Sequence, residues 1–328
     1  MLYKFMIKIA IIGCGRIFNK HYIAINNTTG IKLVAVCDID KKKFKNIPNG
    51  ISCYTNINQM LTEVNPDLIS ICTPSGLHVE HANIALKHKK NVLLEKPIDV
   101  NYLRSLNLVN KFKKSSKKLF LVKQNRYNKT IIFLKDVIRK NKLGKIKLVL
   151  CNVLWSRPET YYQESKWRGT KKLDGGVILN QSSHYIDLLM WLFGEIDKFK
   201  VIRKRLSRKI ECEDTALVSI YFKKKILANL TMTTLVPFKN YEGSITVIGD
   251  KGLIKIGGQA LNEIVETINI KLTKKHNYEI DDIYGHGHLK VYKEVVKNLT
   301  NKKNEAVFAS EGLKSLKFIN QLYSQSKI

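Results

Sequence analysis

The stretch FMIKIAIIGCGRIF, residues 5–18, decides the fold class of this chain. Phe5 to Ile12 is an apolar run typical of a buried strand, and the residues from Ile17 have helical character. Gly13 permits a tight turn between the two, and Gly15 lets the backbone approach a pyrophosphate that helix N–H groups would bind. The sixth position of the pattern is Phe18 rather than glycine, so a purely structural strand–helix turn stays the alternative.

A carboxylate at the end of the second strand favours NAD over NADP. The apolar run Lys32 to Cys37 ends at Asp38, 23 residues after Gly15, where an acid can accept hydrogen bonds from both ribose hydroxyls. A carboxylate at that place would repel a 2′-phosphate. The nearby lysines 41–43 weaken this preference.

The order of apolar runs predicts the architecture. In the first part, strands and helices alternate, with strands expected at 5–12, 32–37, 68–72, 91–94 and 119–122 and helices at 17–27, 57–64, 79–89 and 102–112. Such alternation predicts a parallel sheet with helices on both faces. The later part has consecutive strands, expected at 201–206, 215–222, 226–234, 244–248, 252–256 and 264–272, which favour an antiparallel or mixed sheet.

Helices are expected at 130–140, 177–193, 288–299 and 313–323, and a further strand at 146–155. The prediction is therefore an α/β chain with two domains. Residues 1–122 form a Rossmann-type parallel sheet domain, and residues 123–328 form an α+β domain with a large, mostly antiparallel sheet.

Composition excludes several classes of protein. The 328 residues are 44% hydrophobic, enough for a large core, and no apolar run reaches the ~18 residues of a membrane span. The six cysteines form no CxxC pair, which favours free thiols in a reducing cytoplasm. The net charge of +30 would suit a nucleic-acid-binding protein, but the lysines form no single block and no DNA-reading element is evident, so we expect no specific nucleic acid.

Polar residues follow three of the predicted strands. They are Asp38, the run Thr73-Pro74-Ser75, and the run Glu95-Lys96-Pro97. Ligands of open parallel sheets bind beyond the carboxyl ends of the strands, so Lys96 would aim its amine at a cofactor cleft. A partly desolvated lysine loses its proton more easily, which would suit acid–base chemistry. The alternative is that Lys96 is an ordinary surface lysine.

The helix expected at 177–193 carries a second group of polar residues. Asn180, His184 and Asp187 lie at i, i+4 and i+7, hence on one helical face. Gly175 and Gly176 before it allow a close approach of the backbone. A metal site at His184 and Asp187 lacks further ligands at suitable spacing, so we expect no metal, and a histidine hydrogen-bonded within the protein is the plainer alternative.

These segments together resemble the glucose–fructose oxidoreductase/inositol dehydrogenase (Gfo/Idh/MocA) family over nearly the whole chain. The resemblance rests on GCGRI from Gly13, CTPSGLH from Cys72, EKP from Glu95 and GGVILNQSSHYIDLLMW from Gly175. It implies Lys96 and His184 as the catalytic pair. It further implies that the NAD site includes Gly13, Cys14, Gly15, Arg16, Ile17, Asp38, Thr73, Pro74, Ser75, His78, Glu95, Lys96 and Gln124.

One departure points to a branch of the family. The usual motif has Asp four residues before the histidine, and this chain has Asn180. With the stretch from Ser156 and the run Gly285-His286-Gly287-His288 with Tyr292, it is similar to the bacterial UDP-N-acetyl-glucosaminuronate 3-dehydrogenases, which make precursors of diacetamido-uronic sugars for surface polysaccharides such as the LPS O-antigen.

The branch resemblance implies oxidation of the sugar 3-hydroxyl, with Asn180 hydrogen-bonded to the sugar. Such a substrate carries a diphosphate and a carboxylate, so Arg157 and Arg168 are candidates to bind them, and solvated loop arginines are the alternative. Gln181 and Tyr161 are further candidate substrate residues, and packing of the loop is the alternative for Tyr161. The resemblance also implies a homodimer or homotetramer, and 2-oxoglutarate as a possible second substrate that reoxidises NADH. Two alternatives stay open. One is another sugar or polyol dehydrogenase of the same family, and the other is an NAD-binding regulator without enzymatic activity.

Overall fold

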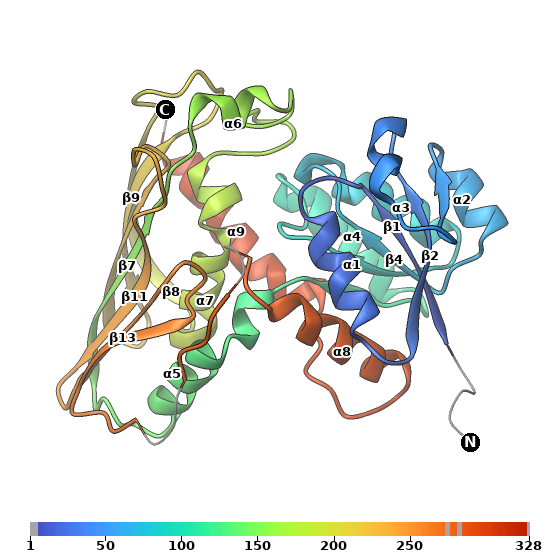
Figure 1. Ribbon diagram of the computed structural model, residues 1–328. Helices are drawn as coiled ribbons and strands as arrows, with labels where there is room; N and C mark the ends of the chain where they lie inside the picture. The colour runs from blue at the N-terminus through green and yellow to red at the C-terminus, as the bar shows by residue number, and fades with distance from the viewer. Residues whose placement is uncertain (1–5, 273–275, 281–283, 327–328) are drawn as a thin grey trace. The chain divides into compact units, whose positions relative to one another are not determined.

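The computed structural model describes residues 6–272, 276–280 and 284–326. The chain forms two compact units, of which the first comprises the residues up to Gln124 together with His288–Leu316. The second comprises Asn125–Gly287 and Lys317–Ile328. Each unit is described by itself below, and Figure 1 shows the ribbon of both.

The first unit is built on a six-stranded parallel sheet in the order β3-β2-β1-β4-β5-β6. Its strands are β1 (Ile7–Ile12), β2 (Ile31–Cys37), β3 (Ser52–Tyr54), β4 (Leu68–Ile71), β5 (Asn91–Leu94) and β6 (Leu119–Leu121). The order reverses at β1, which lies between β2 and β4, and ligands of such sheets bind at this switch point. The predicted Rossmann-type sheet is confirmed; Phe5, at the start of the predicted first strand, lies outside the described residues.

The parallel strands are buried on both faces, as helical crossovers require. All four residues of β4 are buried, and β1 exposes only Lys8. The helices of this unit are α1 (Phe18–Asn26), α2 (Ile57–Glu63), α3 (His78–Lys87), α4 (Tyr102–Lys113) and α8 (Gly287–Leu299, from His288 on), and α9 (Ala309–Gln325) begins here. Short 3-10 turns lie at Lys41–Asn46, Ser75–Leu77 and Gln124–Tyr127. The rings of His21 on α1 and His288 on α8 are in contact, so these helices lie side by side (Figure 1).

The second unit contains a seven-stranded sheet in the order β13-β12-β11-β7-β10-β9-β8. Its strands are β7 (Ile146–Leu154), β8 (Ile196–Lys204), β9 (Thr215–Phe222), β10 (Ile226–Thr233), β11 (Glu242–Gly249), β12 (Leu253–Gly257) and β13 (Glu263–Ile268). Only the pair β7 and β10 is parallel, which confirms the mostly antiparallel sheet. The helices are α5 (Lys129–Arg139), α6 (Glu159–Gln163), a π-helical segment (Val177–Gln181), α7 (Ser183–Phe193) and the end of α9.

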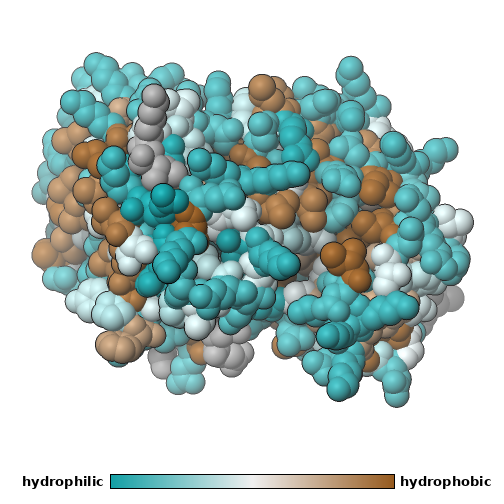
Figure 2. All heavy atoms as spheres, turned by 90° about the horizontal axis from the view of Figure 1, so that it is seen from above, coloured by the Kyte–Doolittle hydropathy of each residue, from teal (hydrophilic) through white to brown (hydrophobic). Residues whose placement is uncertain are grey.

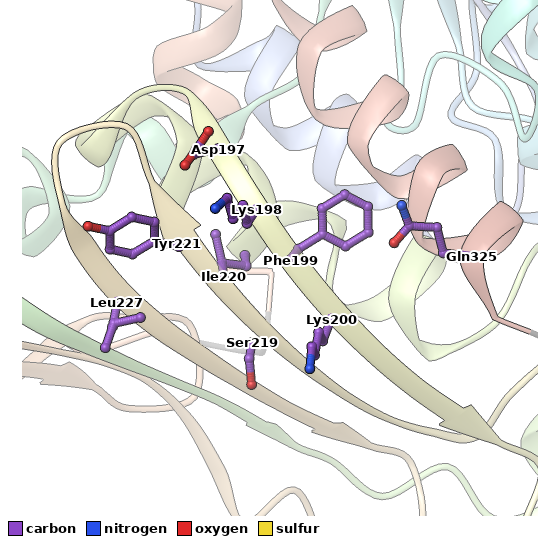
Figure 3. Close-up of a pocket in the computed structure, with 9 residues that line it drawn as sticks. All are labelled: Asp197, Lys198, Phe199, Lys200, Ser219, Ile220, Tyr221, Leu227 and Gln325. Carbon is purple, nitrogen blue, oxygen red and sulfur yellow. The ribbon is translucent and has the colours of Figure 1, made fainter.

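Helices cover one face of this sheet and leave the other open (Figure 1). Along β9 and β10 every second residue is buried, whereas Leu217 and Leu227 on the opposite face are exposed. A hollow of about 530 Å³ lies over β8, β9 and β10 and is lined by residues such as Lys198, Tyr221 and Leu227 (Figure 3). Seen from above, hydrophobic residues gather at the left edge of the molecule, where this sheet lies (Figure 2). None of the predicted site residues lines the hollow.

Some elements have other ends than expected, such as β8, which begins at Ile196 and not at residue 201, and β3 and α6 were not expected at all. Two larger features also differ from the sequence-based expectations. The single helix expected at 177–193 is divided into the π segment and α7, which begins at Ser183. Residues 288–316, which the predicted division after residue 122 assigns to the second domain, pack with the first unit. Both differences have a physical cause in side-chain contacts described below.

None of the helices in the described part of the chain combines the length and the hydrophobicity that crossing a lipid bilayer requires.

Candidate functional site

The glycine loop after β1 has the backbone shape that a dinucleotide needs. Gly13 has a φ of +99°, and an added Cβ would lie 2.7 Å from the carbonyl of Cys72, so only glycine fits. At Gly15 an added Cβ would meet nothing within 4 Å, so this side of the loop is open. The first turn of α1 carries no acidic residue, and its N-cap Ile17 makes no side-chain cap. The loop and the start of α1 therefore leave room and N–H groups for a phosphate.

Asp38 follows β2 and lies against this loop. Its Oδ2 accepts a hydrogen bond from the Cys14 amide at 2.8 Å, and its Oδ1 accepts one from the Asp40 amide at 2.9 Å. Each carboxylate oxygen has a second lone pair, so both can still accept from a ribose hydroxyl. Gly15 and Arg16 beside it are exposed. These residues fit the adenosine and pyrophosphate part of NAD.

His78 joins the segments after β4 and β5. Its Nδ1 lies 2.7 Å from the carbonyl oxygen of Pro97, and its Nε2 lies 2.8 Å from that of Thr73. The side chain is buried, and burial lowers the pKa of His78, with the two carbonyl contacts acting in the opposite direction. The imidazole therefore holds the loops around Pro74, Ser75 and Lys96 in place. Gln124, the last predicted cofactor residue, lies buried in the 3-10 turn after β6.

The side chain of Glu95 turns into the interior of the first unit. Its Oε1 accepts hydrogen bonds from Nε2 of His21 at 3.0 Å and Nε2 of His288 at 3.3 Å. Tyr292 on α8 and Ser70 on β4 extend the network through the Nδ1 atom of His21, at 2.7 and 3.1 Å. The network fastens α8 to the sheet, which explains why residues 288–316 belong to the first unit.

The network holds the Glu95 carboxylate against two imidazoles. Burial alone would raise the pKa of Glu95, but the hydrogen bonds from His21 and His288 outweigh it and hold that pKa well below its usual range. For His21 burial has the opposite effect and lowers the pKa of the imidazole. The amide of Lys96 donates to Glu95 Oε2 at 3.1 Å, so the carboxylate also fixes the backbone of the predicted catalytic residue.

The same three residues are the group in the described ranges that could hold a metal ion, with ligand atoms within 4.8 Å of one another. Both imidazole nitrogens point at one carboxylate oxygen at hydrogen-bond distance. A metal ligated at ~2.0–2.2 Å could not lie between a nitrogen and that oxygen unless the carboxylate moved away. Protons account for the arrangement, and the expected absence of a metal stays a prediction.

In the second unit, the predicted helix is not one regular α-helix. The amide of Ser182 donates to the carbonyl of Val177 at 2.9 Å, an i to i+5 bond that inserts one residue before α7. Asn180 therefore belongs to the π segment, and His184 belongs to the regular α-helix that follows it. Asp187 is bound by Arg126, whose Nε and Nη2 donate to its two oxygens at 2.8 and 3.0 Å. Asp187 thus belongs to a buried ion pair and not to a ligand site.

His184 and Gln181 are both buried, at the second residue of α7 and at the end of the π segment. The π segment is held by Glu213, whose Oε1 accepts from the Ile178 amide at 3.1 Å and whose carbonyl accepts from the Val177 amide at 3.1 Å. A Cβ at Gly176 would collide with the Glu213 carboxylate, so glycine is required there. Sequence patterns gave no sign of Glu213, because it comes from a distant loop.

The predicted substrate residues Arg157, Arg168 and Tyr161 lie together. The Tyr161 ring has the Arg168 guanidinium at 4.1 Å and the Arg157 guanidinium at 5.2 Å from its centroid. Arg168 donates to Glu164 and to the Tyr161 carbonyl at 2.8 and 2.7 Å, and its side chain is nearly buried. Arg157 donates through Nη1 alone, to the Ser156 carbonyl and to Asn240, as far as the described residues show. Arg168 also donates through Nη1 alone within the described residues, so the two differ in the near burial of Arg168 and in its ion pair with Glu164.

The comparisons with known proteins agree with this geometry. Residues 7–123 match the oxidoreductase family with an NAD-binding Rossmann fold, GFO_IDH_MocA, and residues 135–327 match the C-terminal alpha/beta domain of the same family. The chain belongs to the Gfo/Idh/MocA oxidoreductase family. As a member of this family it is an NAD-dependent dehydrogenase, and the predicted cofactor NAD is confirmed.

Several Gfo/Idh/MocA relatives are similar over almost the whole chain. The WlbA dehydrogenase from Bordetella pertussis, solved with NADH and UDP-GlcNAcA, is 32% identical with a TM-score of 0.92 over 99% of this chain and 96% of its own. The WlbA dehydrogenase from Chromobacterium violaceum, solved with the same molecules, is 37% identical with a TM-score of 0.88 over 97% and 93%. Myo-inositol 2-dehydrogenase from Thermotoga maritima is 22% identical over 94% and 93%.

Proposed function

We propose that this protein oxidises the 3-hydroxyl of UDP-N-acetyl-D-glucosaminuronic acid to the 3-keto sugar with NAD. In this proposal it takes part in the cytoplasmic synthesis of a diacetamido-uronic acid for a bacterial surface polysaccharide such as the LPS O-antigen. The observation that carries the proposal is the similarity, at 32% and 37% identity over nearly the full length, to two dehydrogenases solved with NADH and this nucleotide sugar.

The residues of the first unit suit the cofactor side of the reaction. Bound NAD accepts the hydride from carbon 3 of the sugar. Gly13 and Gly15 admit the pyrophosphate, Asp38 accepts hydrogen bonds from the ribose, and His78 keeps the loops after β4 and β5 in place. Lys96 follows β5 at the carboxyl edge of the sheet, so its amine is one candidate to take the proton of the 3-hydroxyl.

The residues of the second unit suit the sugar nucleotide. In this proposal His184 is the other proton acceptor or polarises the developing carbonyl, and Asn180 with Gln181 hydrogen-bonds the sugar. Arg157, with donors left beside Nη1, and Arg168 would hold the diphosphate or the carboxylate, while Tyr161 fixes the two guanidinium groups.

The open face of the seven-stranded sheet supports the proposal of a homodimer or homotetramer. The exposed apolar side chains of Leu150, Ile202, Leu217 and Leu227 lie on neighbouring strands of this face. Burying them against a second copy would remove apolar surface from water.

Substrate oxidation in a single turnover tests the proposed function. Purified protein with NAD is mixed with UDP-N-acetyl-D-glucosaminuronic acid, with UDP-N-acetylglucosamine as the control that lacks the carboxylate, and with myo-inositol. We expect the absorbance of NADH to rise with the sugar acid and to rise much more slowly with UDP-N-acetylglucosamine or myo-inositol. Oxidation of myo-inositol but not of the acid would contradict the substrate and leave the family assignment intact. Mass spectra of the protein after turnover would show whether NADH leaves or awaits a second substrate such as 2-oxoglutarate.

A further inference from the structure

A buried carboxylate, Asp174, lies directly beside the predicted sugar-binding amide. Asp174 is 1% exposed. Its Oδ1 accepts a hydrogen bond from Nδ2 of Asn180, and its Oδ2 accepts one from the Gly169 amide at 2.6 Å. One carboxylate thus connects the π segment with the loop that follows Arg168.

The contact determines which way round the Asn180 amide lies. An ionised carboxylate can only accept hydrogen bonds, so the NH₂ end of the amide must face Asp174 and the Oδ1 end must face away from it. The backbone of Asn180 is fixed as well, because its amide donates to the Gly176 carbonyl at 2.9 Å and Glu213 holds Ile178 two residues earlier. The amide cannot turn over without losing the bond to Asp174.

The same contact accounts for an amide rather than a carboxylate at position 180. An aspartate there would set two carboxylates against each other, and one of them would then have to stay protonated. The amide is neutral, so it does not repel an anionic substrate, and its carbonyl oxygen offers an acceptor to a hydroxyl or an N–H group.

We propose that Asp174 is a positioning residue that orients Asn180, so that Oδ1 of Asn180 accepts a hydrogen bond from a hydroxyl or acetamido N–H of an anionic sugar substrate. This inference rests on the proposed function, which places Asn180 at the sugar. Asp174 itself touches no substrate. Asp174 also accepts from the Gly169 amide next to Arg168, so the proposed sugar contact and the proposed anion contact are both held by this carboxylate.

The proposal is tested by exchanging the two side chains. The variants are Asp174→Asn, Asn180→Asp and the double variant Asp174→Asn/Asn180→Asp, which restores a carboxylate–amide pair with reversed polarity. The readouts are the KM for UDP-N-acetyl-D-glucosaminuronic acid, the Kd of NADH and the Tm. Asp214→Asn is the matched control, because Asp214 is also buried in this unit and accepts from the amides of Leu206, Ser207 and Arg208.

We expect Asp174→Asn to raise the KM by about tenfold, the worth of one well-placed hydrogen bond, while the Kd of NADH stays unchanged. For Asn180→Asp we expect a raised KM that increases further with pH, because the paired carboxylates lose their shared proton. The double variant should recover the Tm but not the KM, since position 180 then presents a charge. Asp214→Asn should lower the Tm and leave the KM unchanged.

Other ionisable groups lie near the pair in Asn180→Asp. Tyr161, Tyr162 and Cys212 interact with Asp174, and burial raises the pKa of each, to about 12 for Tyr162 and Cys212, so they stay neutral between pH 5 and pH 9. Burial also raises the pKa of Glu213, which contacts the π segment in the wild type as well, so the carboxylate pair is reported by the KM of the variant relative to that of the wild type at each pH.

Two results would overturn the proposal. One is a double variant that regains both the Tm and the KM, which would make the pair structural only. The other is an Asp174→Asn protein whose KM equals that of the wild type. Failure of the proposed function is seen separately, in a wild type that does not oxidise the sugar acid. The same variant-to-wild-type KM ratios are then measured with the polyol that it does oxidise, and the same two results decide.

Discussion

Glu95 and Lys96 are neighbours in the chain with opposite tasks. Glu95 faces the interior, where two imidazole N–H groups and the Lys96 amide offset the cost of burying its charge. Because the carboxylate is ionised and saturated with donors, it is unsuited to exchange protons during a reaction. In the proposed function, acid–base work at this strand end would therefore fall to Lys96.

Replacing the two proposed acid–base groups tests their role. Lys96→Met removes the amine with similar bulk, and His184→Asn keeps a polar group without a base. Each should lower the single-turnover rate of NADH formation by ~10²–10⁴-fold, the usual contribution of a positioned acid or base. The Kd of NADH, measured by fluorescence titration, should stay unchanged. A Lys96→Met protein as fast as the wild type would make Lys96 structural.

Cofactor choice is predicted to depend on Asp38. The wild type should bind NADH at least ~10-fold more tightly than NADPH, because a 2′-phosphate would meet the Asp38 carboxylate at close range. Asp38→Ser should reduce this preference, because we expect NADH to bind more weakly and NADPH more tightly. Fluorescence titration with both cofactors measures it. Equal binding of NADH and NADPH by the wild type would contradict this role of Asp38 and would point to the lysines at 41–43.

Arg157 and Arg168 should respond differently to truncation. Arg157→Ala removes a guanidinium with donors to spare, so the KM for the sugar acid should rise by a factor corresponding to ~1.5–3 kcal/mol, with little change in Tm. Arg168→Ala empties a nearly buried position and removes an ion pair with Glu164, so its Tm should fall as well. Unchanged KM values in both variants would show that this loop does not hold the substrate anion.

At the scale of elements, apolar patterns located most of the helices and strands but not the irregular ones. β5 spans the predicted residues, and so does β9, because both follow clear apolar runs between turn residues. The π segment was not predicted, because Val177, Ile178 and Leu179 are all buried and show no periodicity that would reveal an inserted residue. The three-residue β3 and the short α6 carry too few residues for a pattern.

Helix α8 should contribute a pH-dependent part of the stability through Glu294. Burial would raise the pKa of Glu294, but hydrogen bonds from Lys297, Lys290 and the Glu305 amide lower it from 4.5 to about 2. A depressed pKa stabilises the folded state above pH 4.5, and this contribution is lost as the pH falls toward 2.

The free energies of unfolding of the wild type and Glu294→Gln, measured by denaturant titration, should therefore converge on acidification. We expect their difference to shrink by about 2 kcal/mol between pH 6 and pH 3. Glu80→Gln, at an exposed position of α3 in the same unit, is the control and should show no such convergence. A difference that stays constant with pH would contradict the assigned contacts.

At the scale of the whole molecule, the open sheet face is predicted to hold the oligomer together. Leu217→Lys/Leu227→Lys places two charges among exposed apolar side chains and should convert the oligomer to monomers. Light scattering after size exclusion measures the mass. Leu103→Lys, at a leucine that is 70% exposed on α4 of the first unit, should keep the wild-type mass. A monomeric wild type would contradict the predicted assembly.

The sequence did not reveal that residues 288–316 complete the first unit. Glycine turns and strand ends predicted the sheet, Asp38 beside the loop and Lys96 after β5, because these features are local. Glu95 contacts His21, 74 positions earlier, and His288, 193 positions later, while Tyr292 joins through His21, and no local pattern connects such distant side chains. For the same reason Asp174 and Glu213 were recognised only from their contacts with the π segment.

The attachment of α8 to the first unit has a consequence for synthesis on the ribosome. The residues up to Gln124 leave the exit tunnel long before His288 and Tyr292, so the growing chain carries Glu95 and His21 without two of their partners. Enclosing the Glu95 carboxylate without its His288 donor is costly, so we expect the nascent sheet not to mature as soon as its sixth strand appears. The NAD-binding half, although its sheet is translated first, is expected to be finished only after α8 has been translated as well.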